Sequence, residues 1–310
     1  MDVAPINRIK RLIGFALRGP EYMSRYLFPQ SMWKWYDALA RKAGLRQLYF
    51  VLSFDCDTVK DAAVVLDVDE KLRDMGVKPV YAVPGEVLSA SASVYQELAA
   101  RGAEFINHGY VLHTTWDAAT NQYDSCFFYD DLSVDELRRD IEQGHEAILD
   151  ILGVSAVGFR APHFGCVREQ QLREVHGVLQ DLGYRFSSST IPEYAFTHGS
   201  VFSDFGLVEF PVSGWWRQPY NIQDSWGYMA APGASLGAEG YYAHARETAN
   251  QFRKRGHVGI LNYYADPSQV YDKPEFFEAV KCWNSVATST TYGGIMDDLA
   301  ELNGVAKNVG

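Results

Sequence analysis

The chain has 310 residues, 47% of them hydrophobic and 22% charged, so it can bury one large core and lacks the composition of a disordered chain. Residues 1–48 hold nine Lys/Arg and three Asp/Glu, a balance of +6, which leaves −17 for the rest of a chain whose net charge is −11. The acidic main body argues against nucleic acid as the substrate, because phosphate binding needs a basic surface.

The cysteines and the apolar runs bear on the cellular location of the protein. The four cysteines are far apart and form no CxxC pair, which argues against a disulfide framework and a zinc-thiolate site. No apolar run approaches the roughly 18 residues of a membrane span, and the N-terminus lacks the apolar core and cleavage site of a signal peptide. We therefore expect a cytoplasmic protein.

Residues 1–46 are predicted to form a basic helical extension. Apolar residues at helical spacing alternate with basic ones between Arg8 and Arg18, and aromatic residues follow from Tyr22 to Tyr36. A helix of this kind can lie on the anionic inner face of a membrane, which would make the protein peripheral there. The alternative is a helix packed on the main domain or on a second subunit of a homo-oligomer.

Residues 47–310 are predicted to form one α/β domain, because short apolar strands alternate with amphipathic helices. The expected strands are 49–54, 79–83, 104–107, 157–160, 184–187, 208–211 and 259–262, and the expected helices are 61–75, 92–101, 134–152, 168–182, 241–255 and 273–285. This number of strands in a chain of this length favours a distorted seven-stranded (β/α) barrel over a doubly wound sheet. In a barrel, catalytic side chains lie at the C-terminal ends of the strands.

Polar side chains follow three of these strands. Asp55 and Asp57 come after the first, His108 and His113 after the third, and Arg160 ends the fourth. Two imidazoles and one carboxylate are a ligand set for a divalent metal that keeps one position open for water. An arginine beside two acids would orient a carboxylate and hold it ionised. The plainer alternatives are helix N-cap acids and a surface salt bridge.

Taken in order, these segments resemble the motifs of the polysaccharide deacetylase family, the carbohydrate esterases with a NodB-like domain. Ser53-Phe54-Asp55-Cys56-Asp57 resembles the first motif, His108-Gly109-Tyr110 with a further histidine the second, and Arg160-Ala161-Pro162 the third. The branch with Asp-x-Asp and His-Gly-Tyr is the closer likeness. The resemblance covers roughly residues 47–270 and implies a distorted barrel of parallel strands.

The resemblance also implies a role for each residue. Asp55 would be the general base that takes a proton from the attacking water, and Arg160 would tune it. Asp57, His108 and His113 would hold a divalent metal, with zinc expected first and cobalt or nickel as alternatives. The implied reaction is amide hydrolysis, in which the metal stabilises charge on the carbonyl oxygen.

Two departures from the family pattern concern the site. The family histidines are usually four residues apart, whereas His108 and His113 are five apart. On a regular helix five residues turn about 140° past a full circle, so a one-residue π-bulge would be needed to bring both to one face. The family also usually has a catalytic acid histidine near the end of the last strand, where this chain has Asp266. Asp266 with a raised pKa, or His163, is the replacement.

Three functions follow as alternatives. The first is removal of an acetyl group from an N-acetylated sugar, activated or lipid-linked, in surface-polysaccharide biosynthesis. The second is an amidohydrolase for a small non-sugar or cyclic amide, and the third is a catalytically weak carbohydrate-binding relative. The aromatic stretch 215–220 would contact a sugar ring or belong to the core, and residues 114–131 are a candidate cover for the site.

Overall fold

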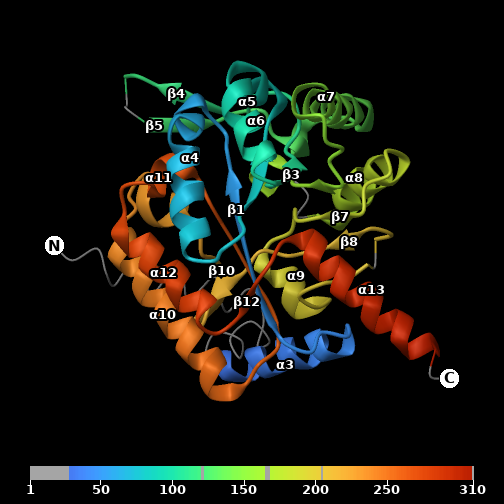
Figure 1. The fold of residues 1–310 in the computed structure, drawn as a ribbon, viewed down its shortest axis with the longest axis vertical. Helices are drawn as coiled ribbons and strands as arrows, with labels where there is room; N and C mark the ends of the chain where they lie inside the picture. The colour runs from blue at the N-terminus through green and yellow to red at the C-terminus, as the bar shows by residue number, and fades with distance from the viewer. Residues whose placement is uncertain (1–27, 120–121, 165–167, 204, 309–310) are drawn as a thin grey trace.

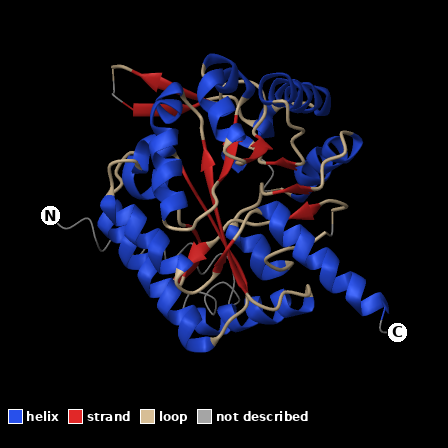
Figure 2. Ribbon diagram, viewed as in Figure 1, coloured by secondary structure: helices blue, strands red, loops and turns tan. Residues whose placement is uncertain are grey.

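The computed structural model describes residues 28–119, 122–164, 168–203 and 205–308. At its centre lies a curled sheet of parallel strands that helices surround on the outside (Figure 1; Figure 2). In spatial order the main path of the sheet is β11 (Gly259–Ala265), β1 (Leu48–Asp55), β2 (Val80–Val83), β3 (Glu104–Asn107), β6 (Gly158–Phe159), β7 (Phe186–Ser187) and β8 (Val208–Glu209). A short strand, β12 (Thr288–Ser289), pairs with the beginning of β1. The seven strands of the path are the seven predicted ones, which confirms the distorted barrel.

The six predicted helices are all present, and their bounds differ from the predicted ones by a few residues at most. They are α4 (Val59–Asp74), α6 (Ala92–Ala100), α7 (Val134–Leu152), α8 (Glu169–Asp181), α10 (Gly237–Arg255) and α12 (Pro274–Asn284). Helix α3 (Pro29–Lys42) lies within the extension that was predicted to be helical. The elements that the periodicity did not predict are α5 (Gly85–Ala90), α9 (Pro192–Thr197), α11 (Pro267–Val270), α13 (Tyr292–Asn308), the short turns η1 (Tyr129–Asp131), η2 (Pro162–Phe164) and η3 (Trp226–Ala230), and two antiparallel pairs, β4 (Thr114–Asp117) with β5 (Gln122–Ser125) and β9 (Gly214–Trp215) with β10 (Gln218–Ile222).

Strand β1 is buried along its whole length and divides two apolar clusters. Phe50, Leu52 and Phe54 pack in the cluster that includes the surrounding helices, whereas Tyr49 and Val51 belong to the cluster enclosed by the curl of the sheet. Successive side chains of a strand point to opposite faces. Asp55 falls in the row of Tyr49 and Val51, so the strand directs its carboxylate toward the interior of the barrel.

The two ends of the sheet path, β8 and β11, are joined by the segment that follows β8. Nδ2 of Asn262 donates to the carbonyl oxygens of Phe210 and Pro211, at 3.0 and 3.1 Å, and the Ser213 amide donates to the Asn262 carbonyl at 2.8 Å. Strands β8 and β11 are therefore not paired with each other, and the buried side chain of Asn262 bridges the gap between them.

Helix α3, the described part of the N-terminal extension, packs beneath the barrel. Its Trp33 Nε1 donates to the Trp216 carbonyl at 2.9 Å, and the Tyr36 hydroxyl donates to the Ile260 carbonyl at 2.6 Å. The predicted helix between Arg8 and Arg18 lies outside the described residues. Among the residues that are described, no helix combines the length and apolar character that crossing a bilayer requires.

Candidate metal centre

A pocket of about 340 Å³ opens at the C-terminal ends of the strands. Asp55 reaches it from the end of β1, His108 from the residue after β3, His163 from the turn after β6 and Asp266 from the residue after β11. Five aspartates line it: Asp55, Asp57, Asp61, Asp224 and Asp266. Side chains that are more than 200 residues apart in the sequence therefore meet in one acidic pocket.

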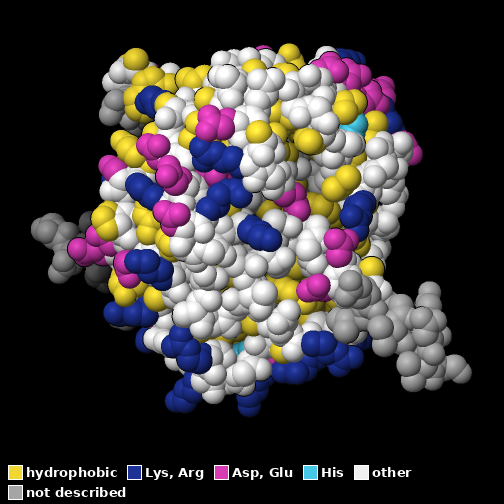
Figure 3. Space-filling view, in the orientation of Figure 1, with side chains coloured by type: hydrophobic (Ala, Val, Ile, Leu, Met, Phe, Trp, Pro, Cys, Tyr) yellow, Lys and Arg dark blue, Asp and Glu magenta, His cyan; other side chains and the backbone are white. Residues whose placement is uncertain are grey.

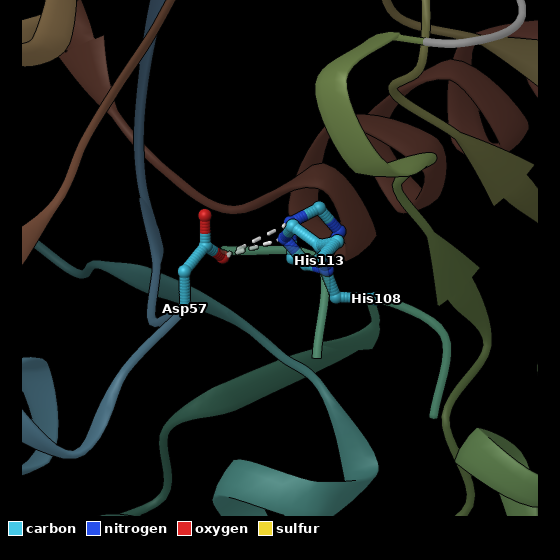
Figure 4. A group of neighbouring side chains, drawn as sticks. All are labelled: Asp57, His108 and His113. Carbon is cyan, nitrogen blue, oxygen red and sulfur yellow. Dashed lines mark ion pairs between the residues drawn. The ribbon is translucent and has the colours of Figure 1, made fainter. Parts of the chain in front are cut away.

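Asp57, His108 and His113 form the only group of three or more His, Cys, Asp or Glu in the described part of the chain whose ligand atoms all lie within 4.8 Å of one another. Oδ1 of Asp57 lies 3.0 Å from Nε2 of His113 and 3.4 Å from Nε2 of His108, and Figure 4 shows the carboxylate facing both rings. Two ligand atoms of a tetrahedral metal with bonds of about 2.1 Å stand about 3.4 Å apart. The spacing therefore suits one divalent ion.

The hydrogen bonding of the three side chains also fits a metal. Oδ1 of Asp57 and both ring nitrogens of His113 are buried and have no hydrogen-bond partner among the described residues, although such atoms are nearly always satisfied. Nδ1 of His108 lies 2.8 Å from the Arg160 carbonyl oxygen, which can only accept, so Nδ1 carries the proton and the lone pair of Nε2 faces Asp57. Burial raises the pKa of Asp57, but the two histidines outweigh burial and hold that pKa well below its usual value.

The segment between the two histidines is a loop, so the helical interpretation of their spacing and the π-bulge that it required are wrong. Gly109 takes a left-handed φ of 78°, and the backbone amides of Tyr110 and Val111 donate to Oδ1 of Asp140 on α7, at 3.1 and 2.9 Å. Folded around this carboxylate, the loop returns His113 to His108, with the two ring centroids 4.6 Å apart.

Arg160 is fully buried, so the alternative of a surface salt bridge is wrong. Its Nη1 donates to Oδ1 of Asp55 at 2.6 Å, its Nη2 to the Tyr292 hydroxyl at 2.7 Å, and its Nε to the Ser188 carbonyl at 3.1 Å. Burial lowers the pKa of Arg160, but Asp55 and two tyrosine hydroxyls outweigh burial and raise it overall. A permanently charged guanidinium, held on three sides, therefore fixes the carboxylate of Asp55.

The two candidates for the catalytic acid have opposite electrostatics. Burial raises the pKa of Asp266 well above its usual value, and the other aspartates of the pocket raise it further. Burial lowers the pKa of His163, as does the proximity of His113, and Nε2 of His163 lies 2.8 Å from the His113 carbonyl oxygen. Of the two, Asp266 is the group whose pKa shift favours the protonated form that an acid needs.

Residues 114–131 supply part of the pocket wall, in line with their predicted role as a cover. The hairpin of β4 and β5 contributes Thr114, Tyr123 and Ser125, and Phe128 follows it. Nζ of Lys60, on α4, lies 3.2 Å from the centroid of the Trp116 ring, which attaches the hairpin to the barrel by a cation–π contact.

The aromatic stretch 215–220 belongs mainly to the core. Trp215 stacks on His244, with centroids 3.5 Å apart, and Trp216 is 3% exposed. The sequence reasoning missed Trp226, Asp224 and Tyr264, which line the pocket. Tyr264 lies two residues beyond the predicted end of the last strand, so a longer strand prediction would have placed it at the site. Trp226 in η3 and Asp224 just before it could not be found in this way, because this segment shows no periodic pattern.

Comparison with known proteins relates the fold to one class of solved structures. No family model matches the chain, and no curated protein matches it by sequence. A presumed polysaccharide deacetylase from Mycobacterium smegmatis is 18% identical, covers 83% of this chain and 92% of its own, and superposes with a TM-score of 0.60. The chain therefore has the fold of that deacetylase, as the resemblance of its motifs implied.

Two further structures are more distant. The Xyl-CE4 domain of a multidomain xylanase, from the hindgut metagenome of Trinervitermes trinervoides, is 19% identical, with coverage of 84% of this chain and 92% of its own and a TM-score of 0.46. The Bc1960 peptidoglycan N-acetylglucosamine deacetylase is 14% identical, with coverage of 81% and 88% and a TM-score of 0.48.

Proposed function

We propose that the protein is a metal-dependent hydrolase of the polysaccharide deacetylase family that removes an acetyl or similar acyl group from the amide nitrogen of an N-acetylated sugar in surface-polysaccharide biosynthesis. The observation that carries this proposal is the group of Asp57, His108 and His113, whose buried ligand atoms face one another beside the Asp55–Arg160 pair. These three residues would hold a divalent metal, zinc first, which polarises the amide carbonyl and makes water a better nucleophile.

Asp55 acts as the general base. Its carboxylate lines the pocket, and the bond from Arg160 occupies one oxygen and leaves Oδ2 to accept the proton of the attacking water. Arg160 also prevents the carboxylate from rotating, so the acceptor oxygen is in place before the substrate arrives.

Asp266 acts as the general acid that protonates the leaving amine. Its pKa is raised by burial and by the neighbouring aspartates, which favours the protonated form that a general acid needs. Its place on the pocket wall, after β11, puts it in the same pocket as Asp55, Asp57 and His108.

The wall of the pocket supports a sugar as substrate. Phe128 and Trp226, which are 42% and 43% exposed, line the pocket together with Tyr264. Aromatic faces pack well on the apolar faces of sugar rings, while the aspartates offer acceptors for hydroxyl groups. The volume of about 340 Å³ suits a ligand of one or two sugar rings.

Release of acetate from an N-acetylated sugar nucleotide, compared with release from small non-sugar amides, tests the proposal. Purified protein loaded with zinc should release acetate, and Asp55→Asn should keep its metal but turn over about 10²–10⁴-fold more slowly. Asp67→Asn, an exposed aspartate on α4, is the matched control and should behave as the native protein. Preference for the non-sugar amides, no acetate release at all, or full activity of Asp55→Asn would each contradict the proposal.

A further inference from the structure

One face of the molecule is basic, although the chain as a whole carries a net charge of −11. The basic face combines residues of α3 and the turn after it with the C-terminal end of α10: Lys34, Arg41, Lys42, Arg46, Arg253, Lys254 and Arg255. Within segments 28–47 and 250–257, which supply these residues, Asp37 is the only acid. Figure 3 shows Lys and Arg gathering along the lower edge of the molecule, where Figure 1 places α3 and the lower end of α10.

Direct contacts join the two segments into one surface. Nη2 of Arg41 donates to the Gly256 carbonyl at 3.2 Å, just beyond the end of α10. The guanidinium of Arg255 lies 4.7 Å from the centroid of the Trp216 ring, which stacks on Trp33 of α3. The positive charges of the two segments therefore form one surface and attract the same anionic partner.

Most of this charge is not neutralised by the protein. Lys34, Lys42, Arg46 and Lys254 are exposed and make no ion pair or hydrogen bond with the described residues, whereas Arg41 pairs with Asp37. Elsewhere on the surface exposed arginines do have acidic partners, such as Arg173, which lies 2.6 Å from Glu169. Four uncompensated cations within two short segments leave a strong local positive potential.

Two large aromatic side chains accompany the charges. Phe28 is 61% exposed and Trp35 is 57% exposed, and Trp35 lies beside Lys34 on α3. The Trp35 Nε1 atom donates to the Phe196 carbonyl at 3.0 Å, which holds the ring at the surface. Basic residues mixed with exposed tryptophan and phenylalanine are typical of surfaces that lie at the boundary between lipid headgroups and acyl chains.

We propose that the basic face docks on the surface of an anionic phospholipid bilayer, with Phe28 and Trp35 at the level of the headgroups. This inference goes beyond the proposed hydrolysis and does not depend on it. Duplex nucleic acid would also be attracted by the charge, but it makes no use of exposed aromatic rings that have no unpaired base to stack on.

The docked orientation has a consequence for the substrate. Strand β11 runs from the basic face to the pocket. The Tyr36 hydroxyl of α3 donates a hydrogen bond to the Ile260 carbonyl, near the start of the strand, whereas Tyr264 and Asp266 of the pocket lie at its other end. With a rise of about 3.3 Å per residue, the pocket and the basic face lie on opposite sides of the barrel. A docked molecule therefore turns its pocket away from the bilayer, which favours a water-soluble activated sugar over one anchored in the same membrane.

Co-sedimentation of the full chain with vesicles tests the docking. The native protein should bind vesicles of phosphatidylcholine with phosphatidylglycerol, should release them as the salt concentration rises, and should not bind vesicles of phosphatidylcholine alone. A variant with Lys42→Gln, Arg46→Gln and Lys254→Gln should bind roughly 100-fold more weakly, at about fivefold for each charge. None of these three side chains has a partner to lose within the described structure, so the fold should survive.

A second variant separates the position of the charge from its amount. Arg139→Gln, Arg168→Gln and Arg173→Gln remove three exposed charges from α7 and the beginning of α8, outside the basic face, and should bind vesicles as the native protein does. Equal loss in both variants, native binding by the first variant, or no preference for anionic vesicles would overturn the proposal. Binding to duplex DNA as tightly as to anionic vesicles at the same salt would overturn the choice of lipid.

Discussion

The orientation of His108 depends on Arg160, the residue whose guanidinium also bonds the proposed base, Asp55. Its Nδ1 proton is held by the carbonyl of Arg160, whose side chain holds Asp55. Arg160, the residue just after β6, therefore orients both a proposed metal ligand and the proposed catalytic carboxylate. A change in the backbone at Arg160 would disturb metal binding and proton transfer together, which links two parts of the site that come from different strands.

Removal of the His108 imidazole should abolish tight metal binding. His108→Ala loses one of three protein ligands, and we expect the zinc affinity to fall more than about 100-fold, because loss of supporting partners alone costs 10–100-fold. Metal analysis after dialysis measures this. His145→Ala, a partly buried histidine whose Nδ1 meets the Tyr184 hydroxyl away from the pocket, is the control and should retain metal. Unchanged metal content in His108→Ala would remove His108 from the ligand set.

Asp266 should determine the alkaline side of the pH–rate profile. Because its pKa is raised in the folded protein, the acid form is present at low pH and is lost as the pH rises through that pKa, so turnover should fall there. Asp266→Asn cannot donate the proton, and we expect a rate about 10²–10⁴-fold lower with no alkaline limb. The exposed neighbour Asp272 provides the control, Asp272→Asn. An unchanged alkaline limb in Asp266→Asn would assign the acid to another group.

At the scale of single residues, the sequence predicted which side chains meet but not how. Asp55, Asp57 and His108 were predictable because strand ends of a parallel barrel converge at one edge. The position of His113 was not, because it depends on a loop wrapped around Asp140, a residue of α7 that the motifs do not include. Apart from Asp55, the partners of Arg160 were equally unpredictable, since Ser188 and Tyr292 belong to distant segments.

Among the elements, helix α13 has an effect on the site that its sequence does not reveal. Tyr292, its first residue, accepts from Nη2 of Arg160 and donates to Oδ1 of Asn262 at 2.8 Å. It thereby connects the guanidinium to the amide that closes the barrel. The sequence predicted strands and long amphipathic helices well, because each has a clear periodicity. It missed α13 and the two hairpins, whose buried contacts are irregularly spaced.

The hydroxyl of Tyr292 should be needed for turnover but not for metal binding. In Tyr292→Phe the ring packing remains while a buried charged donor loses a partner, so we expect kcat to fall about tenfold with KM and metal content little changed. Tyr49→Phe is the control: it removes a 2.9 Å bond from a tyrosine to Asp298 on the same helix without touching Arg160. If both variants lose kcat equally, the effect comes from anchoring of α13 and not from positioning of Arg160.

For the whole molecule, the proposed metal should contribute to stability. A ligand that binds only the folded chain at 100 times its Kd adds about 2.7 kcal/mol to the free energy of unfolding, which for a chain of this length corresponds to a rise of about 4 °C in Tm. Scanning calorimetry with zinc and with excess chelator should show this difference in the native protein and not in Asp57→Asn. The same Tm in both conditions for the native protein would contradict a metal at this site.

The pairing of β1 with β11 joins the early and late parts of the chain, with Leu48 opposite Gly259 and Phe54 opposite Ala265. During synthesis one edge of β1 therefore stays open until the ribosome has released residue 265, and an open edge is prone to pair with other chains. Truncated chains that end before β11 should therefore aggregate more readily than the full chain.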